Sequence, residues 1–435
     1  MIIRTLIILT ILAQGVYADI HPGYYSHEVI EKQILSGSIE YRYIMIGQRS
    51  IRHPVHVITI DLKKNDYQLQ PLKTPYGIRQ LSKLHDIAYF NDSVTNSKVI
   101  AAINANFWQA YTNYPIGPFV QAGEIVELSS YKQWSSFIID NNNVPYIDRI
   151  NLNAMLINKR DTLIIDNFNH RKDSTQNIIY NSKNFNIIPY INADIESEFL
   201  SRWAVMNEKM LDDDSTETLP DSSVLYNEII EEHKLANTEY PLKKYACEFI
   251  DEPIINIPIR CIVKSISIGE TLVPKNGFLL STGDINGNEP AYRIGDTLEY
   301  LVRSDIMSNT PIKHIITGTP RLVRRGKAEH EAYTEGSTGR RFIHRQLART
   351  AIGYTKNKDT LILATVEYTS RKYRKKGADL NDMAAIMKSL GCYDAMNLDG
   401  GGSSIMLIDG KNVMSGNNPD AGRKISTGFG IILSE

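Results

Sequence analysis

The sequence is poor in cysteine, which excludes a small fold held together by disulfide bonds. Its 435 residues contain only three cysteines, Cys247, Cys261 and Cys392, and their spacing matches no zinc-binding motif. Cys247 and Cys261 could pair in an oxidising compartment and leave Cys392 free. The alternative is that the first two are thiols of the apolar core, and the sequence leaves both alternatives open.

An excess of charge of either sign is also absent. The 48 Lys and Arg residues balance 49 Asp and Glu residues, and the formal net charge is -1. Such a chain has no overall field to attract nucleic acid or an anionic membrane, so we expect neither as a partner. The hydrophobic fraction of 42% and the charged fraction of 22% are typical of a globular protein with a sizeable core.

Long apolar runs are missing from the sequence after its first residues. No segment beyond the N-terminus reaches the ~18 apolar residues of a membrane-spanning helix. The N-terminus itself combines Arg4, the apolar run Leu6–Leu12 and the small-residue site Val16–Ala18. This pattern predicts a signal peptide cleaved before Asp19, and therefore a secreted or periplasmic protein. A buried N-terminal strand or a membrane anchor is the alternative.

Alternating apolar residues and β-branched residues predict mostly strands. The clearest are His53–Asp61 and the fully apolar Val99–Ile103. Helices are predicted at Leu81–Phe90 and after Asp379, which can cap a helix that Gly391 ends. Further short strands are predicted at residues 137–139, 161–165, 178–180, 257–268, 278–280 and 321–327, the last running into a turn.

Composition changes in the middle of the chain. Residues 191–234 are rich in Glu, show helical spacing and contain the acidic run Asp212–Asp214. The run does not have the spacing of an EF-hand loop, so a solvated and partly helical insertion is favoured over a calcium site. We therefore predict an α+β fold of mixed β-sheets with flanking helices. It comprises a signal peptide (1–18), an N-terminal segment (19–52) and one catalytic domain (53–435) that carries the insertion.

A triple-glycine turn carries the strongest chemical signal. Asp399 follows a short strand ending at Leu398, and the strand Ile405–Ile408 comes soon after the glycines. Glycines permit positive φ and close approach to a ligand, and backbone N–H groups in such a turn can bind an anion. A nucleotide-binding loop would need a helix directly after the glycines, so that alternative is disfavoured. A tight hairpin without a ligand is the structural alternative.

Several motifs, in order along the chain, resemble the phosphodiester glycosidase family. The nearly identical ones are Arg349–Gly353 and Asn397–Ser404. Departures are Asn104-Ala105 where the family has Asn-Gly, and Glu367-Tyr368-Thr369 where it has Asp-Gly-Arg, unless Arg371 supplies the arginine. Weaker matches lie at residues 102–108, 115–117, 169–171 with 178–180, 274–283, 318–323 and at Arg423.

The resemblance implies hydrolysis of a sugar-1-phosphodiester at the anomeric carbon, and a role in exopolysaccharide or cell-envelope glycan processing. A phosphate ester leaves readily, so an anion clamp and a carboxylate are needed more than a strong general acid. The residues that we expect to be catalytic are Asp399, Glu367 and Arg349. The residues that we expect to bind substrate are Asn104, Asn397, Gly400, Gly401, Gly402, Ser403 and Arg423.

Two other functions stay open on the sequence. A non-catalytic polysaccharide-binding protein would use the same Asn, aromatic and Arg residues without turnover. A phosphodiesterase would cut the P–O bond instead of the C–O bond. The sequence shows no cluster of metal ligands, and we expect neither a metal ion nor another cofactor.

Overall fold

The computed structural model describes residues 25–48, 51–64, 66–74, 77–95, 97–159, 161–183, 187–189, 194–212, 221–283, 290–368, 377–415 and 422–433. Helix accounts for 17% and strand for 43%, which confirms the predicted α+β class. The predicted signal peptide lies outside the described residues. None of the described helices is long and apolar enough to cross a membrane.

The first sheet has eight strands, and every neighbouring pair in it is antiparallel. Described residues of the N-terminal segment supply two of its strands, so this segment pairs directly with the predicted catalytic domain. The order across the sheet is β1 (Tyr25–Ile34), β2 (Ile39–Gln48), β3 (Ile51–Asp61), β24 (Thr360–Val366), β23 (Arg349–Tyr354), β25 (Asp394–Asn397), β21 (Arg321–Arg324) and β22 (Lys327–Ala328).

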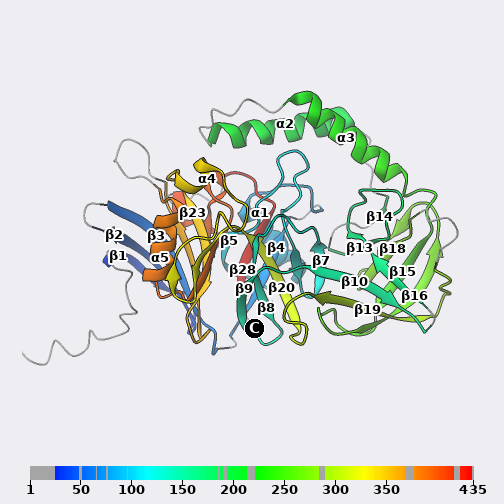
Figure 1. Cartoon of the computed structure of the whole chain (residues 1–435), viewed down its shortest axis with the longest axis horizontal. Coiled ribbons are helices and arrows are strands. Elements are labelled where there is room, and N and C mark those ends of the chain that lie inside the picture. The colour runs from blue at the N-terminus through cyan, green and yellow to red at the C-terminus, as the bar shows by residue number, and fades with distance from the viewer. Residues whose placement is uncertain are drawn as a thin grey trace, which may run out of the picture.

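Two five-stranded sheets pack beside the first (Figure 1). One core contains residues of all three, including Ile352, Phe429 and Phe137. The second sheet has the order β27 (Lys411–Asn412), β26 (Met406–Ile408), β5 (Val99–Asn104), β28 (Thr427–Leu433) and β4 (Tyr67–Lys73). The third has the order β7 (Glu124–Glu127), β6 (Phe119–Gln121), β20 (Ile312–Gly318), β8 (Ser135–Asp140) and β9 (Pro145–Asp148).

Helices cover the outer faces of the first two sheets. The predicted late helix is α5 (Leu380–Ser389), and its apolar face packs on the first sheet. Asp379 and Asp382 form a capping box, and Gly391 follows the helix with φ +100°. The earlier helix, α1 (Leu84–Thr95), packs on the second sheet and begins three residues later than predicted. Ser82 instead pairs with Ile425 as an isolated bridge, which keeps the chain extended up to that point.

A fourth sheet forms a second lobe, to the right in Figure 1, and shares a core with the third sheet. Cys247 and Cys261 belong to that core, and the structure contains all three cysteines as buried free thiols, as the core alternative expects. The strand order is β11 (Thr162–Ile165), β10 (Leu152–Ile157), β19 (Thr297–Ser304), β16 (Ile259–Ser267), β15 (Lys244–Phe249), β18 (Gly277–Ser281), β13 (Ile178–Asn181) and β12 (Asn167–Phe168). A small ladder, β14 (Ile187–Ile188) with β17 (Thr271–Leu272), accompanies it.

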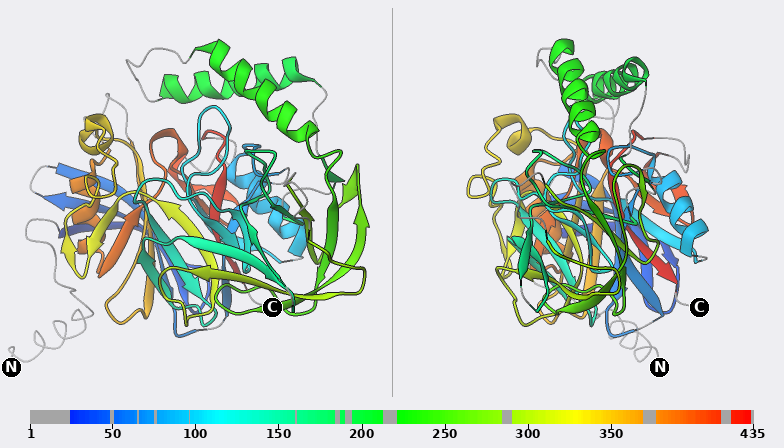
Figure 2. Two further views of the ribbon diagram at one scale, coloured as in Figure 1. Left: turned by 45° about the vertical axis from the view of Figure 1, so that its right-hand side comes forward. Right: turned by 90° about the vertical axis from the view of Figure 1, so that its right-hand side faces the viewer.

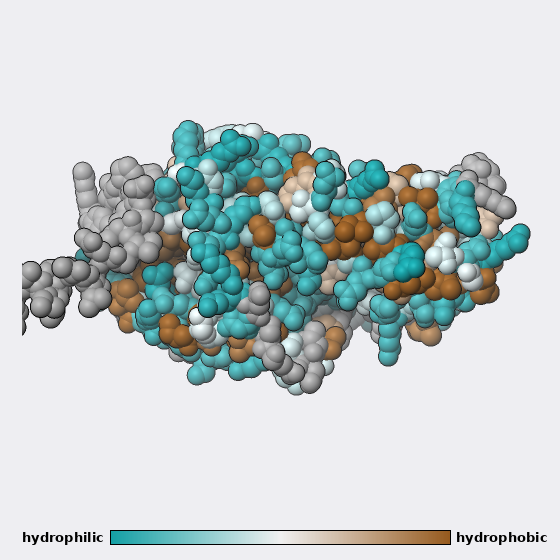
Figure 3. Space-filling model, turned by 90° about the horizontal axis from the view of Figure 1, so that it is seen from below, coloured by the Kyte–Doolittle hydropathy of each residue, from teal (hydrophilic) through white to brown (hydrophobic). Residues whose placement is uncertain are grey.

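The predicted insertion contains two helices, α2 (Ile195–Asp212) and α3 (Ser222–Asn237). They lie together across one side of the body (Figure 2). A small apolar cluster that includes Met206, Leu225 and Ile229 attaches them to the loop after β5. The opposite face of the molecule is mostly hydrophilic, with apolar patches between the hydrophilic side chains (Figure 3).

Candidate active site

The predicted site residues gather where strands of the first and second sheets end on the same side. β5 ends at Asn104, β23 begins at Arg349 and β25 ends at Asn397. Because β23 pairs with both β24 and β25, Glu367, Arg349 and Asp399 follow one another across three adjacent strands. We call this edge, from Glu367 through Arg349 to Asp399 and Asn104, the rim. Helix α2 contacts the short 3₁₀ turn η2 (Gly401–Ser403) at the rim.

Asn104 links the two sheets through its side chain. Its Nδ2 donates to the backbone oxygen of Asp399 at 2.7 Å. Its Oδ1 accepts from Thr350 Oγ1 at 2.7 Å and from the Ile405 N–H at 3.1 Å. The residue is buried, with 1% of its surface exposed. The carboxamide therefore fixes both ends of the glycine turn against β23, and these three hydrogen bonds are internal to the protein.

The glycine turn is held tightly by its own hydrogen bonds. The N–H groups of Gly400, Gly401 and Ser403 donate to Asp399 Oδ1, Ala348 O and Gly400 O, respectively. Only Gly401 of the three glycines has positive φ, at +60°. Gly400 is needed for another reason, since a Cβ there would lie 3.2 Å from Ala348 O. These three N–H groups already have partners, so an anion would have to compete for them.

Arg349 is buried beside the glycine turn, with 1% of its surface exposed. Its Nε donates to Ala378 O at 3.0 Å, and its Nη2 donates to Phe342 O at 2.8 Å and to Arg345 O at 3.0 Å. Its Nη1 lies 3.9 Å from where a Cβ of Gly400 would be. Three of its five donors therefore organise backbone, and Nη1 faces the turn.

Glu367 lies at the other end of the rim in a hydrogen-bonded chain. Its Oε1 lies 3.0 Å from His56 Nε2, and Tyr43 donates to its Oε2 at 3.3 Å. His56 Nδ1 lies 2.8 Å from the Tyr41 hydroxyl, and Tyr43 stacks on the imidazole. The carboxylate is partly exposed while His56 is buried, so the chain positions a carboxylate at the surface of the rim.

Asn397 and Arg423 occupy different surroundings. Asn397 is fully buried, and its Nδ2 donates to Thr319 O and to Leu398 O, both at 2.7 Å. Its Oδ1 is buried without a hydrogen-bond partner among the residues that the structure describes. Arg423 is also buried, and the neighbouring Gly422 lies against Ile405 just after the glycine turn. The side chain of Asn397 therefore lies inside the rim, whereas Arg423 follows a glycine that passes close to the residue after the glycine turn.

Three contributors were not singled out from the sequence as site residues. Thr350 and His56 hold Asn104 and Glu367, but each partner is hundreds of positions distant in the chain. Glu335 is fully buried next to Thr319, accepting from Ser135 Oγ at 2.6 Å and the Arg321 N–H at 2.9 Å. Burial raises the pKa of Glu335 above its usual value. Of these three residues, Thr350 alone had a local sequence signal for a place in the site, because it lies within the Arg349–Gly353 motif.

No group of three or more His, Cys, Asp or Glu side chains placed to hold a metal ion occurs among the described residues. The polar groups proposed for the site are carboxylates, amides, hydroxyls and two arginines. This set suits a polar, hydroxyl-bearing or phosphate-bearing substrate.

Residues 262–432 match the family model described as phosphodiester glycosidase. This part of the chain is therefore similar to the phosphodiester glycosidase family. It includes β23, β24, α5, the glycine turn and most of β28, and so holds Arg349, Glu367, Asp399 and Arg423. Asn104 lies outside the matched range and reaches the site through the second sheet.

Three proteins illustrate what the chain is similar to in sequence or in fold. Over 120 residues the chain is 29% identical to the N-acetylglucosamine-1-phosphodiester alpha-N-acetylglucosaminidase of Bos taurus, covering 26% of this chain and 22% of that protein. A crystal structure of a hypothetical protein from Synechocystis gives a TM-score of 0.61 at 17% identity, covering 94% of this chain and 64% of that one. A crystal structure of a protein from Burkholderia pseudomallei K96243 gives a TM-score of 0.52 at 14% identity. The match covers 90% of this chain and 74% of that one. The chain therefore spans about a fifth of the bovine relative and less than two thirds of the Synechocystis protein.

Proposed function

We propose that this chain is a hydrolase that cleaves the sugar C1–O bond of a sugar-1-phosphodiester at the rim. The observation that carries the proposal is the Asn104–Thr350–Asp399 junction. It presents a carboxylate beside a glycine turn, with Arg349 and Glu367 on the two strands next to it. The match of residues 262–432 to the phosphodiester glycosidase family model supports the same chemistry.

In this proposal the two carboxylates have different surroundings and different roles. Asp399 lies at the glycine turn, whereas Glu367 is bound by His56 and Tyr43. Asp399 follows β25 and Glu367 follows β24, and β23 lies between these two strands. Because neighbouring strands are ~4.8 Å apart, the backbones of the two residues lie about 10 Å apart. We assign the activation of water to Asp399, which lies at the glycine turn. Glu367 then stabilises the oxocarbenium-like transition state.

The phosphate needs cationic donors, because a departing phosphate ester carries negative charge. Arg349 Nη1 faces the glycine turn, and the second candidate is the buried Arg423, whose neighbour Gly422 lies against Ile405. Guanidinium groups pair with phosphate through two parallel hydrogen bonds. We therefore assign the phosphate to the space between these two arginines, and the sugar to the side of Asp399.

We further propose that the protein is secreted or periplasmic and acts on phosphate-containing glycans of exopolysaccharide or the cell envelope. The signal-peptide pattern at Arg4 to Ala18 supports export. The similar Burkholderia protein is named as a candidate exported protein. The near-zero net charge supports a partner other than nucleic acid.

The test is a screen of the purified mature chain against UDP-sugars and sugar-1-phosphodiesters, with release of reducing sugar as the readout. Asp399→Asn removes the charge and keeps the shape, so we expect kcat to fall by about 10²-fold or more with unchanged folding. Asp409→Asn, at the exposed hairpin after β26, is the matched control and should retain full activity. Absence of sugar release from every substrate would favour a non-catalytic binding protein.

A further inference from the structure

Helix α2 lies against two segments that adjoin the glycine turn. It contacts η2 itself and the loop that follows β5. Tyr111 of that loop packs on the same apolar cluster as Phe199 and Trp203 of α2, and its backbone oxygen accepts from Arg202 Nη1 at 3.0 Å. Figures 1 and 2 show α2 above this side of the body. The helix therefore stands at the entrance to the rim.

The C-terminal end of α3 is fixed to the second lobe. Glu239 follows α3, and its Oε1 accepts from Arg171 Nε at 2.5 Å and from the Tyr180 hydroxyl at 2.8 Å. Its Oε2 accepts from Ser281 Oγ at 2.5 Å. The side chains of Arg171 and Glu239 are 1% and 2% exposed. Separating a buried and fully hydrogen-bonded ion pair is strongly unfavourable, so this end of the insertion is an anchor.

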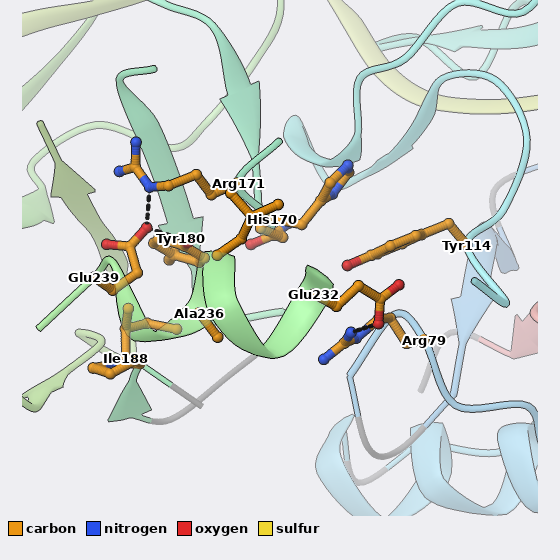
Figure 4. A pocket seen from close by; sticks show the side chains of 12 residues that line it. Arg79, Tyr114, His170, Arg171, Tyr180, Ile188, Glu232, Ala236 and Glu239 are labelled. Atoms are coloured by element: carbon orange, nitrogen blue, oxygen red, sulfur yellow. Dashed lines mark hydrogen bonds and ion pairs between the residues drawn. The ribbon is translucent and has the colours of Figure 1, made fainter. Parts of the chain in front are cut away.

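Nearer to α2, one carboxylate joins both helices of the insertion to the body. Glu232 on α3 forms an ion pair with Arg79, which precedes α1 (Figure 4). The same carboxylate oxygen lies 2.6 Å from Arg202 Nη2 on α2. Glu198 on α2 pairs with Arg202, and its Oε2 lies 3.2 Å from His233 Nε2 on α3. Glu232 thus holds α2 through Arg202 and the body through Arg79.

The two attachments differ in how far water can reach them. The side chains of Arg79 and Glu232 are 19% and 13% exposed, whereas the Arg171–Glu239 pair is almost fully buried. An ion pair that water reaches is worth less than a buried one, so the Glu232 attachment opens more readily than the anchor. Opening there turns the insertion about its anchored end and moves α2 away from η2.

We propose that α2 is a cap over the rim, that Glu232 latches it, and that the latched cap admits small sugar-1-phosphodiesters and excludes large ones. A bulky group on the phosphate would need the space that α2 occupies beside η2. Glu232 is then a positioning residue that acts on substrate size through α2. The size limit rests on the function proposed above, whereas the cap and its latch do not.

A single thiol beneath α2 tests the cap without any turnover. Gly402→Cys places the thiol on η2, where Gly402 lacks the positive φ of Gly401 and so accepts a side chain. The three native thiols are buried, so the introduced one reports alone. The full mature chain with this change is treated with N-ethylmaleimide or with a maleimide carried on polyethylene glycol. We expect the small reagent to react readily and the large one slowly.

Glu232→Gln, added to this chain, removes the charge of the latch and keeps its shape. We expect it to speed labelling by the large reagent about tenfold or more and to change labelling by the small one less than about twofold, because only the open population grows. Glu231→Gln is the matched control, since Glu231 pairs with Lys234 at the surface. Replacing residues 191–234 by a Gly/Ser linker removes the cap and should give the fastest labelling by the large reagent.

The outcomes separate the cap, the latch and the size limit. The cap is overturned if the large reagent labels the latched and the shortened chains equally fast, or if the small reagent fails on the latched chain. The latch is overturned if Glu232→Gln labels as Glu231→Gln does. Glu232→Gln should also raise kcat/KM for a large sugar-1-phosphodiester relative to a small one, and an unchanged ratio overturns the size limit. Sugar release from no substrate would overturn the size limit with the proposed function, while labelling would still decide the cap.

Discussion

The carboxamide of Asn104 joins three parts of the chain that are far apart in sequence. It bonds to Thr350, to the backbone of Asp399 and to the backbone of Ile405. An Asn at the end of a buried strand is often a simple turn residue. Here it sets the position of the proposed catalytic carboxylate, because both ends of the glycine turn depend on one side chain.

Glu367 gives a test of the second carboxylate. His56 and Tyr43 hold it in place, so Glu367→Gln should remove charge with little rearrangement. We expect kcat to fall by about tenfold or more while the melting temperature changes little, because a positioned charge is lost from the transition state. Glu329→Gln, at an exposed position near β22, is the matched control. Wild-type turnover by Glu367→Gln would make Glu367 a supporting residue of the sheet.

His314 makes the stability of the protein sensitive to acid. Its Nδ1 accepts the Ala122 N–H at 3.1 Å, and burial lowers its pKa from 6.5 to about 3. Below about pH 6.5, His314 therefore binds a proton in the unfolded chain but stays neutral in the folded chain. The contribution of His314 to the free energy of unfolding is fully present above this pH and is lost as the pH falls toward 3. At pH 5 the loss from this one group is about 2 kcal/mol.

His314→Asn tests this directly, because the Asn oxygen can accept the same N–H and does not titrate. Urea unfolding at pH 7 and pH 5 gives the free energy of unfolding of both proteins. We expect the variant to lose about 2 kcal/mol less than the wild type between the two pH values. An equal loss in both proteins would show that His314 does not cause the acid sensitivity.

Among the elements, the α2–α3 insertion is the one whose contribution to folding is least evident from its sequence. Its attachment is local: the cluster around Met206, the Arg79–Glu232 ion pair, and Arg202 Nη1 donating to Tyr111 O at 3.0 Å. The main cores lie elsewhere. An element attached in this way can be removed without opening the sheets.

Replacing residues 191–234 by a short Gly/Ser linker should therefore leave cooperative unfolding intact, since the cost of closing a loop grows only slowly with its length. Circular dichroism and thermal unfolding check this. Arg79 would lose its ion pair with Glu232, so we expect some loss of stability. Non-cooperative unfolding of the shortened chain would show that the insertion is part of the core.

For the molecule as a whole, local patterns were sufficient to predict much of the fold. The α5 cap at Asp379, the strand β3 and the strand after the glycine turn follow from nearby residues alone. The core that the second lobe shares with the third sheet did not, because it depends on which strands pair. The pairing of β1 with β2, and of β2 with β3, did not follow from nearby residues either. This pairing makes residues before position 52 part of the first sheet.

The site shows the same division between local and distant effects. Motifs placed Asp399, Arg349 and Asn104 in one region, and the structure brings them together. The internal partners of Arg349 and the burial of Asn397 could not be predicted, since both depend on segments that only the tertiary fold brings near. Their roles in substrate binding, like those of the glycine turn and Arg423, stay predictions.

The central claim is that water attacks the sugar carbon and not the phosphorus. Turnover of a sugar-1-phosphodiester in ¹⁸O-labelled water, followed by mass spectrometry of both products, tests it most directly. Cleavage of the C1–O bond at the rim predicts label in the released sugar and none in the phosphate monoester. Label in the phosphate would mean that the P–O bond breaks, and the mechanism proposed for Asp399 and Glu367 would be wrong.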